Sequence, residues 1–69
     1  MLYKLLFLNA AGEVVKYKYY GNLKTAERYM EYHREFQFAM QRLGHVSWYA
    51  SKLQLEDGNN TLIKEIDVI

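Results

Sequence analysis

The chain has 69 residues, and a domain of this length buries only about 60% of the surface that its unfolded chain exposes. It has no cysteine and two histidines, so neither disulfides nor a zinc cluster are expected to compensate for a small core. Nine basic and eight acidic residues leave a net charge of +1, which excludes a surface that is basic throughout and restricts any nucleic-acid site to a local patch.

Residues 1–69 are expected to form one domain, because proline is absent, the four glycines stand at turn positions and no linker or repeat interrupts the chain. The apolar fraction of 51% is typical of a folded protein. The N-terminal apolar run ends at Leu8 and has neither a preceding charged region nor a cleavage site, so we expect no signal peptide and no membrane span. The expected location is the cytoplasm.

Two runs of apolar, aromatic and β-branched residues, 2–8 and 13–20, predict a β-hairpin. Pairing of Asn9 with Glu13 places Gly12 in the left-handed position of a three-residue loop. Continued without interruption, this register directs Tyr17 and Tyr19 to the core. The reverse face then carries Leu2, Lys4, Leu6, Leu8, Val14, Lys16, Lys18 and Tyr20.

One helix is predicted over residues 23–43, with Asn22 as its N-cap and Gly44 after its last turn. Its apolar residues cover an arc of roughly 200°, wider than the stripe that one sheet face requires, so another contact on its flank is expected. Phe38 projects from the charged side and is either a scattered surface ring or an interface residue. The arc comprises Leu23, Ala26, Tyr29, Met30, Tyr32, His33, Phe36, Ala39, Met40 and Leu43.

Residues 57–60, Asp-Gly-Asn-Asn, predict a second hairpin in which Asp57 pairs with Asn60. This register places Leu55 opposite Leu62 on a mostly apolar face. The order ββαββ predicts an α+β two-layer sandwich, a four-stranded antiparallel sheet with one long helix packed on one face. The patterns do not determine the strand order. The other face of this hairpin pairs Lys52 with Glu65, Gln54 with Ile63, and Trp48 with Ile69.

Catalysis is not expected, because the chain offers no cysteine and no spacing of nucleophile and base. His33 is interpreted as a packed residue of the helix, and His45 follows the helix end, where the dipole favours a cation. Residues 56–60 are too few for a calcium loop. We therefore expect no enzyme activity, no metal and no cofactor; a ribonuclease without metal is the only chemistry that the composition leaves open.

Lys4, Lys16 and Lys18 are predicted to form a like-charge patch on the reverse face, beside Tyr20. This patch suits a phosphate or another anion, and thus nucleic acid. The alternative is that lysines on an edge strand prevent aggregation between sheets.

The reverse face presents more apolar side chains than a monomer normally exposes, which favours a protein interface or a homodimer. A slipped register in one hairpin, or a strongly coiled sheet, would bury part of this surface instead. The candidate protein-interface residues are Leu6, Leu8, Val14, Tyr20, Trp48, Ile63, Ile69 and Phe38.

These features indicate a small non-enzymatic protein-binding module that acts through an apolar, tyrosine-rich surface on a protein partner or on a second copy of itself, without membrane association. In size and composition the chain resembles the small accessory proteins of bacteriophages and prophages, which implies an inhibitor or modulator of a host protein. The second hypothesis is a small nucleic-acid-binding regulator that uses Lys4, Lys16 and Lys18.

Overall fold

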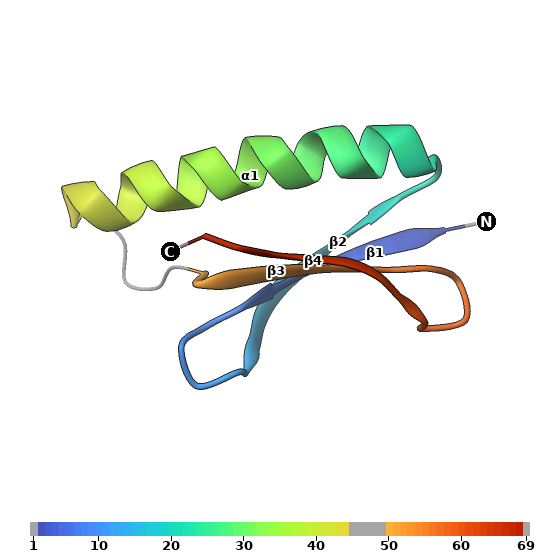
Figure 1. Ribbon diagram of the computed structural model, residues 1–69, viewed down its shortest axis with the longest axis horizontal. Helices are drawn as coiled ribbons and strands as arrows, with labels where there is room; N and C mark the ends of the chain where they lie inside the picture. The colour runs from blue at the N-terminus through green and yellow to red at the C-terminus, as the bar shows by residue number, and fades with distance from the viewer. Residues whose placement is uncertain (1, 45–49, 69) are drawn as a thin grey trace.

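The computed structural model describes residues 2–44 and 50–68. Its elements follow in the order β1 (Tyr3–Leu8), β2 (Val14–Tyr20), α1 (Leu23–Leu43), β3 (Lys52–Glu56) and β4 (Leu62–Asp67). The strands form one antiparallel sheet in the order β2-β1-β3-β4, and α1 lies across one face of it (Figure 1). The predicted ββαββ two-layer fold is confirmed. The two hairpins meet through their first strands, which the sequence left open.

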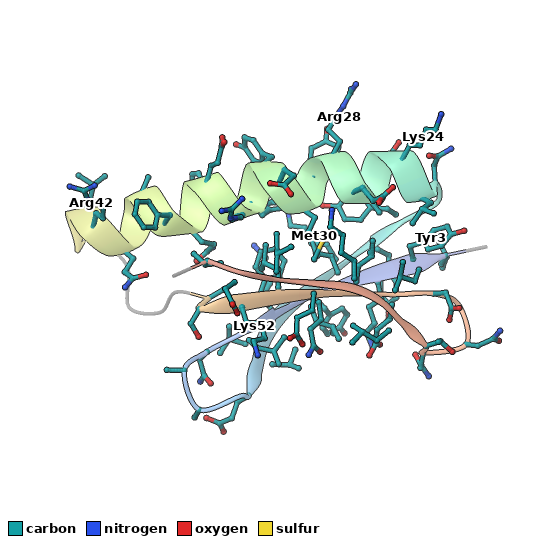
Figure 2. The ribbon with its side chains drawn as sticks, viewed as in Figure 1. Tyr3, Lys24, Arg28, Met30, Arg42 and Lys52 are labelled. Carbon is teal, nitrogen blue, oxygen red and sulfur yellow. The ribbon has the colours of Figure 1, made fainter. Side chains whose placement is uncertain are left out.

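The hydrophobic core lies between α1 and the central strands β1 and β3. Leu5 and Phe7 of β1 and Leu53 and Leu55 of β3 are buried beneath the helix. Met30 points from α1 toward the sheet and is also fully buried (Figure 2). Burial of a side chain of this size contributes roughly 1.5–3 kcal/mol, so these residues fix the helix over the middle of the sheet.

Both ends of α1 are capped as the sequence predicts. The Asn22 side chain accepts a hydrogen bond from the Thr25 N–H at 3.2 Å, which satisfies one of the free donors of the first turn. Gly44 has a φ of 68°, and its N–H donates to the carbonyls of Met40 and Gln41. The predicted bounds, Leu23–Leu43, are confirmed.

The loop of the first hairpin also follows the prediction, but the strand after it does not. The Asn9 N–H donates to the Glu13 carbonyl at 2.9 Å, and Gly12 has a φ of 82°. Leu8 pairs with Val14, whereas Phe7 pairs with Lys16. Val15 is therefore an extra residue in β2, a β-bulge.

The bulge reverses the facing of every later residue of β2. Lys16, Lys18 and Tyr20 lie opposite Phe7, Leu5 and Tyr3, on the side of the sheet that α1 covers. Tyr17 and Tyr19 lie on the reverse face and are exposed. The prediction that these two tyrosines face the core, and that Lys16, Lys18 and Tyr20 face away, was wrong, because one inserted residue exchanges the two faces of a strand.

The second hairpin has a longer loop than predicted. The Asp57 N–H donates to the Thr61 carbonyl at 3.0 Å, and Asn60 takes the left-handed position with a φ of 61°. A bulge at Ile63 follows, since Glu56 pairs with Leu62 and Leu55 with Lys64. The expected pairings of Asp57 with Asn60 and of Leu55 with Leu62 were wrong. Lys64 pairs with the buried Leu55 and therefore lies on the side of the sheet that α1 covers.

The two hairpins have the same construction. The Oδ1 atoms of Asn9 and Asp57 each accept hydrogen bonds from the N–H groups two and four residues later. Each loop is followed by a bulge, and each bulge by a lysine on the helix side, Lys16 in β2 and Lys64 in β4. Because β1 and β3 pair at Leu6 and Gln54, an approximate twofold axis through that pair relates the hairpins. Lys16 and Lys64 are therefore equivalent positions on opposite edges of the sheet.

Gln37 ties α1 to the start of the second hairpin. Its buried Oε1 accepts a hydrogen bond from the Ala50 N–H at 2.9 Å. We expect Gln37→Leu to lower the free energy of unfolding by about 1–3 kcal/mol, because this buried N–H would lose its acceptor. Urea unfolding followed by circular dichroism measures the change.

Gln41, one turn later on α1, provides a matched control. Its Oε1 is buried and has no hydrogen-bond partner among residues 2–44 and 50–68. Gln41→Leu should therefore leave the free energy of unfolding unchanged or raise it. Equal losses in Gln37→Leu and Gln41→Leu would contradict the role assigned to the Gln37–Ala50 hydrogen bond.

Candidate functional site

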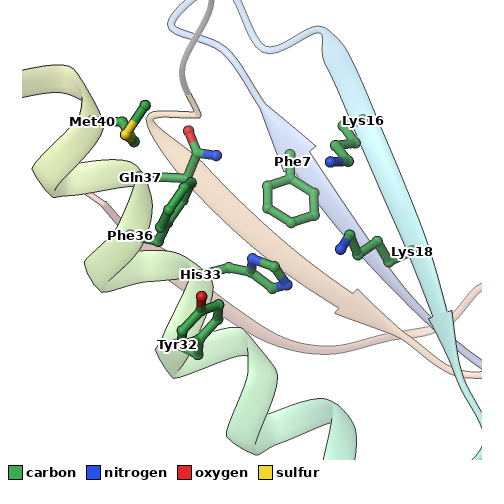
Figure 3. Close-up of a pocket in the computed structure, with 8 residues that line it drawn as sticks. All are labelled: Phe7, Lys16, Lys18, Tyr32, His33, Phe36, Gln37 and Met40. Carbon is green, nitrogen blue, oxygen red and sulfur yellow. The ribbon is translucent and has the colours of Figure 1, made fainter. Parts of the chain in front are cut away.

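A cleft of about 330 Å³ lies between α1 and β2, on the side of the sheet that the helix covers. Lys16 and Lys18 project into it from β2, and His33 projects toward them from the helix (Figure 3). None of the lining residues within 2–44 and 50–68 is acidic, so the electrostatic character of the cleft is positive. The lining consists of Phe7, Lys16, Lys18, Tyr32, His33, Phe36, Gln37 and Met40.

The rim of the cleft continues into an aromatic surface on α1, which we call the aromatic flank: Tyr29, Tyr32 and Phe36. These side chains are 43%, 55% and 47% exposed, although each belongs to the apolar arc of the helix. Tyr32 and Phe36 stack with ring centroids 6.2 Å apart, and Tyr29 meets Tyr32 edge to face at the same distance. The flank is thus one continuous aromatic surface that the sheet does not cover.

Tyr20 connects this flank to the sheet. Its ring stacks on Tyr29 with centroids 5.4 Å apart, and its hydroxyl lies 3.3 Å from Nε2 of His33. Burial, and secondarily Tyr29, raise the pKa of Tyr20, so its hydroxyl keeps its proton. This hydroxyl can donate to His33 when Nε2 carries no proton.

His33 is a half-buried residue of the cleft lining. Its ring lies edge-on to Phe7 at 5.1 Å and to Tyr32 at 5.3 Å between centroids. Burial lowers the pKa of His33, and the charges of Lys18 and Lys16 lower it further. The imidazole is therefore neutral at neutral pH and acquires a charge only under acidic conditions.

The predicted lysine patch is divided between the two faces of the sheet. Lys4 pairs with Tyr19 on the reverse face, and its Nζ lies 5.3 Å from the centroid of the Tyr17 ring. Lys16 and Lys18 lie in the cleft. The expectation of one patch beside Tyr20 on the reverse face was wrong, and the Val15 bulge is the physical reason.

The candidate interface residues are also dispersed. Leu6 and Leu8 lie on the reverse face but are only 7% and 9% exposed, so little of either side chain is accessible to a partner. Tyr20 lies beside the cleft, as described above. Trp48 and Ile69 lie outside the described residues. Val14, Ile63 and Phe38 are exposed, and the Arg42 guanidinium lies over the Phe38 ring at 5.8 Å.

The aromatic flank was not among the residues selected from the sequence. A signal for it was present, because the predicted apolar arc was too wide for one sheet face. Tyr29, Tyr32 and Phe36 lie on the part of that arc that extends beyond the core. Their proximity to Lys16 and Lys18 could not be anticipated without the bulge in β2.

Searches for a metal site, for a membrane-spanning helix and for related proteins bear on the function of the cleft. They contain no group of three histidine or acidic side chains that could hold a metal ion. No helix among them is long and apolar enough to cross a membrane. Comparisons of the chain with protein-family models, curated proteins and solved structures gave no match. Function is therefore inferred from the chemistry of the cleft and the aromatic flank.

The pKa of His33 makes stability depend on pH. In the unfolded chain His33 has its ordinary pKa of about 6.5. In the folded chain the pKa of His33 is lower. At a pH between these two pKa values, the unfolded state binds more protons than the folded state does. The contribution of neutral His33 is therefore complete above about pH 6.5 and decreases as the pH falls toward the folded-state pKa.

His33→Gln should remove this dependence. We expect the difference in free energy of unfolding between wild type and His33→Gln to decrease from about pH 7.5 to about pH 5.5. His45 is present in both proteins, so its titration cancels in the difference. A difference that stays constant, or grows as the pH falls, would show that folding does not lower the pKa of His33.

Proposed function

We propose that this chain is a non-enzymatic protein-binding module whose docking surface is the aromatic flank together with the cleft beneath it. The observation that carries the proposal is the exposure of Tyr29, Tyr32 and Phe36 as one connected set of rings. Tyrosine and other large aromatic side chains provide much of the binding energy at protein interfaces. Two helix turns of such rings, left uncovered by the sheet, are costly unless a partner covers them.

The charge of the cleft indicates what kind of partner fits. Lys16 and Lys18 are complementary to an acidic surface, and none of the described lining residues opposes such a surface with a negative charge. A symmetric contact between two copies through this region would bring the lysines of both copies together, which is unfavourable. We therefore favour a different protein with an acidic and apolar surface over a second copy of this chain.

The resemblance to phage accessory proteins supports a specific mode of action. A module of 69 residues that covers part of another protein's surface can inhibit or modulate that protein by excluding its other ligands. No group in the module itself needs to react.

Affinity capture with paired helix variants tests the proposal. The test variant is Tyr32→Ala with Phe36→Ala, and the control is Phe38→Ala, an exposed ring of similar accessibility outside the flank. We expect wild type and Phe38→Ala to retain one dominant protein from a lysate of the encoding organism. The double variant should lose at least about 2 kcal/mol of binding free energy, as for other interface hot spots.

Two results of the capture experiment would contradict this docking surface. One is equal retention by all three proteins, and the other is loss in Phe38→Ala alone. A light-scattering mass of two chains for the isolated wild type, returned to one chain by Phe36→Ala, would instead assign the aromatic flank to a homodimer.

Nucleic-acid binding is the second candidate, and one observation favours it: lysines and exposed rings share one cleft. Lysines suit phosphates and rings suit unstacked bases. Lys16 and Lys18 are the two cationic side chains among the described lining residues at neutral pH. If each neutralises one phosphate, the logarithm of affinity for single-stranded DNA should fall with the logarithm of salt with a slope of roughly −1.4. Fluorescence anisotropy with a labelled oligothymidine measures it.

Lys18→Ala should then reduce that slope by roughly half, whereas Lys4→Ala, on the reverse face, should leave it unchanged. Absence of binding at low salt, or equal effects of the two substitutions, would exclude a nucleic-acid role for the cleft.

A further inference from the structure

The reverse face of the sheet, turned away from α1, carries exposed apolar side chains. No helix or strand among residues 2–44 and 50–68 covers this face (Figure 1). The large apolar residues that the strand pairings place on it and that are at least half exposed are Val14, Tyr17, Tyr19 and Leu62. Monomeric proteins rarely leave such a group open to water, so a contact with another protein surface is indicated.

The two halves of the reverse face differ in charge. The half formed by β1 and β2 has no acidic residue, and Lys4 Nζ lies there 5.3 Å from the centroid of the Tyr17 ring. The half formed by β3 and β4 has one lysine on this face, Lys52, which pairs with Glu65 at 3.4 Å. Its acidic residues on this face are Glu56, Glu65 and Asp67. One half is therefore aromatic and basic and the other is acidic, so the face is complementary to a second copy of itself.

A twofold axis along the strands, midway between β1 and β3, brings unlike halves together. It places each residue of β1 over the residue that pairs with it in β3, taken from the other copy, and it places β2 over β4 in the same way. Lys4 thus lies over Glu56 of the second copy, because these two residues pair in the sheet. The matching contacts of β2 are Tyr17 over Glu65 and Tyr19 over Leu62. The symmetry makes each contact occur twice.

Other arrangements of two copies are less favourable. A twofold axis across the strands at the level of Leu6 would place Glu65 over Glu65 of the second copy, which brings like charges together. Contact through one half alone would cover too little surface. Four strands about 4.8 Å apart and about 20 Å long cover roughly 400 Å² before the relief of the side chains is added, whereas a stable interface buries about 800 Å² on each partner. Both halves are needed, and the dimer is expected to be weak and reversible.

We infer that the reverse face is the interface of a homodimer, in which the β1–β2 half of each copy lies on the β3–β4 half of the other. Lys4 forms an ion pair with Glu56 of the second copy, and the Tyr17 hydroxyl donates a hydrogen bond to the carboxylate of Glu65. The two helices then lie on the outside of four layers, so both clefts and both aromatic flanks stay accessible, and the repulsion between cleft lysines does not arise. A dimer of this form presents the proposed docking surface twice, which raises the overall affinity for a clustered partner.

Sedimentation equilibrium of the isolated protein tests this interface, whatever the aromatic flank binds. From about 1 µM to about 1 mM, the mass of wild type should rise from one chain toward two. Lys4→Glu and Glu56→Lys should each weaken the dimer by about tenfold or more, because each places like charges in contact twice. An equimolar mixture of the two variants should dimerise about as strongly as wild type. Because Lys4 and Glu56 also pair within one chain, the mixture restores opposite charges only between chains.

Two variants of α1 provide matched controls. Lys24→Glu and Glu35→Lys make the same changes in net charge as the test variants, and Lys24 points away from the sheet (Figure 2). Both controls should dimerise as wild type does, because the helix lies on the other side of the sheet.

Four results would overturn the inference. Wild type could remain one chain at about 1 mM, or the controls could lose as much affinity as the test variants. The mixture of Lys4→Glu and Glu56→Lys could fail to dimerise, which would show that these residues do not meet across the interface. A dimer that Phe36→Ala dissociates and Lys4→Glu does not would place the interface on the aromatic flank instead.

Discussion

The bulge at Val15 decides which side chains of β2 meet the helix, and the rest of the surface follows from it. Without the extra residue, Tyr17 and Tyr19 would lie under α1, and the two lysines would face away from it. With the extra residue, Lys16 and Lys18 stand beside the helix. Lysine side chains cannot close an apolar core, so the space between β2 and α1 remains an open, positively charged cleft.

The helix completes the site because its apolar arc is broader than the sheet beneath it. Met30 and Ala26 fill the core, whereas Tyr29, Tyr32 and Phe36 extend past the sheet edge. At the opposite edge, Lys64 pairs with a helix carboxylate, which makes that side an ordinary solvated contact. Two hairpins of the same construction thus carry one helix whose two flanks differ. One flank pairs a carboxylate with Lys64, and the other presents the aromatic rings that we propose as the docking surface.

The sequence predicted the helix and its caps because those signals are local: Asn22, Gly44 and the apolar arc between them act within a few residues. It also predicted the first loop from Asn9 and Gly12. It could not predict the facing of β2, because strictly alternating lysine and tyrosine is compatible with either phase. Val14 and Val15 suit a strand equally on both faces, so nothing in their identities reveals a bulge. Whether the lysines or the tyrosines of β2 face the helix depends on how the strand pairs with the rest of the sheet, so the cleft could not be predicted from the local sequence.

Nuclear Overhauser contacts between aromatic rings in the isotope-labelled protein test the facing of β2 most directly. The bulge predicts cross-peaks from Tyr20 ring protons to the rings of His33 and Tyr29, because the Tyr20 hydroxyl lies 3.3 Å from His33 Nε2 and the Tyr20 and Tyr29 rings stack at 5.4 Å. It predicts no cross-peak from the Tyr19 ring to the Met30 methyl group. Cross-peaks from Tyr19 to Met30, with none from Tyr20 to His33, would restore the unbulged register and remove the lysines from the cleft.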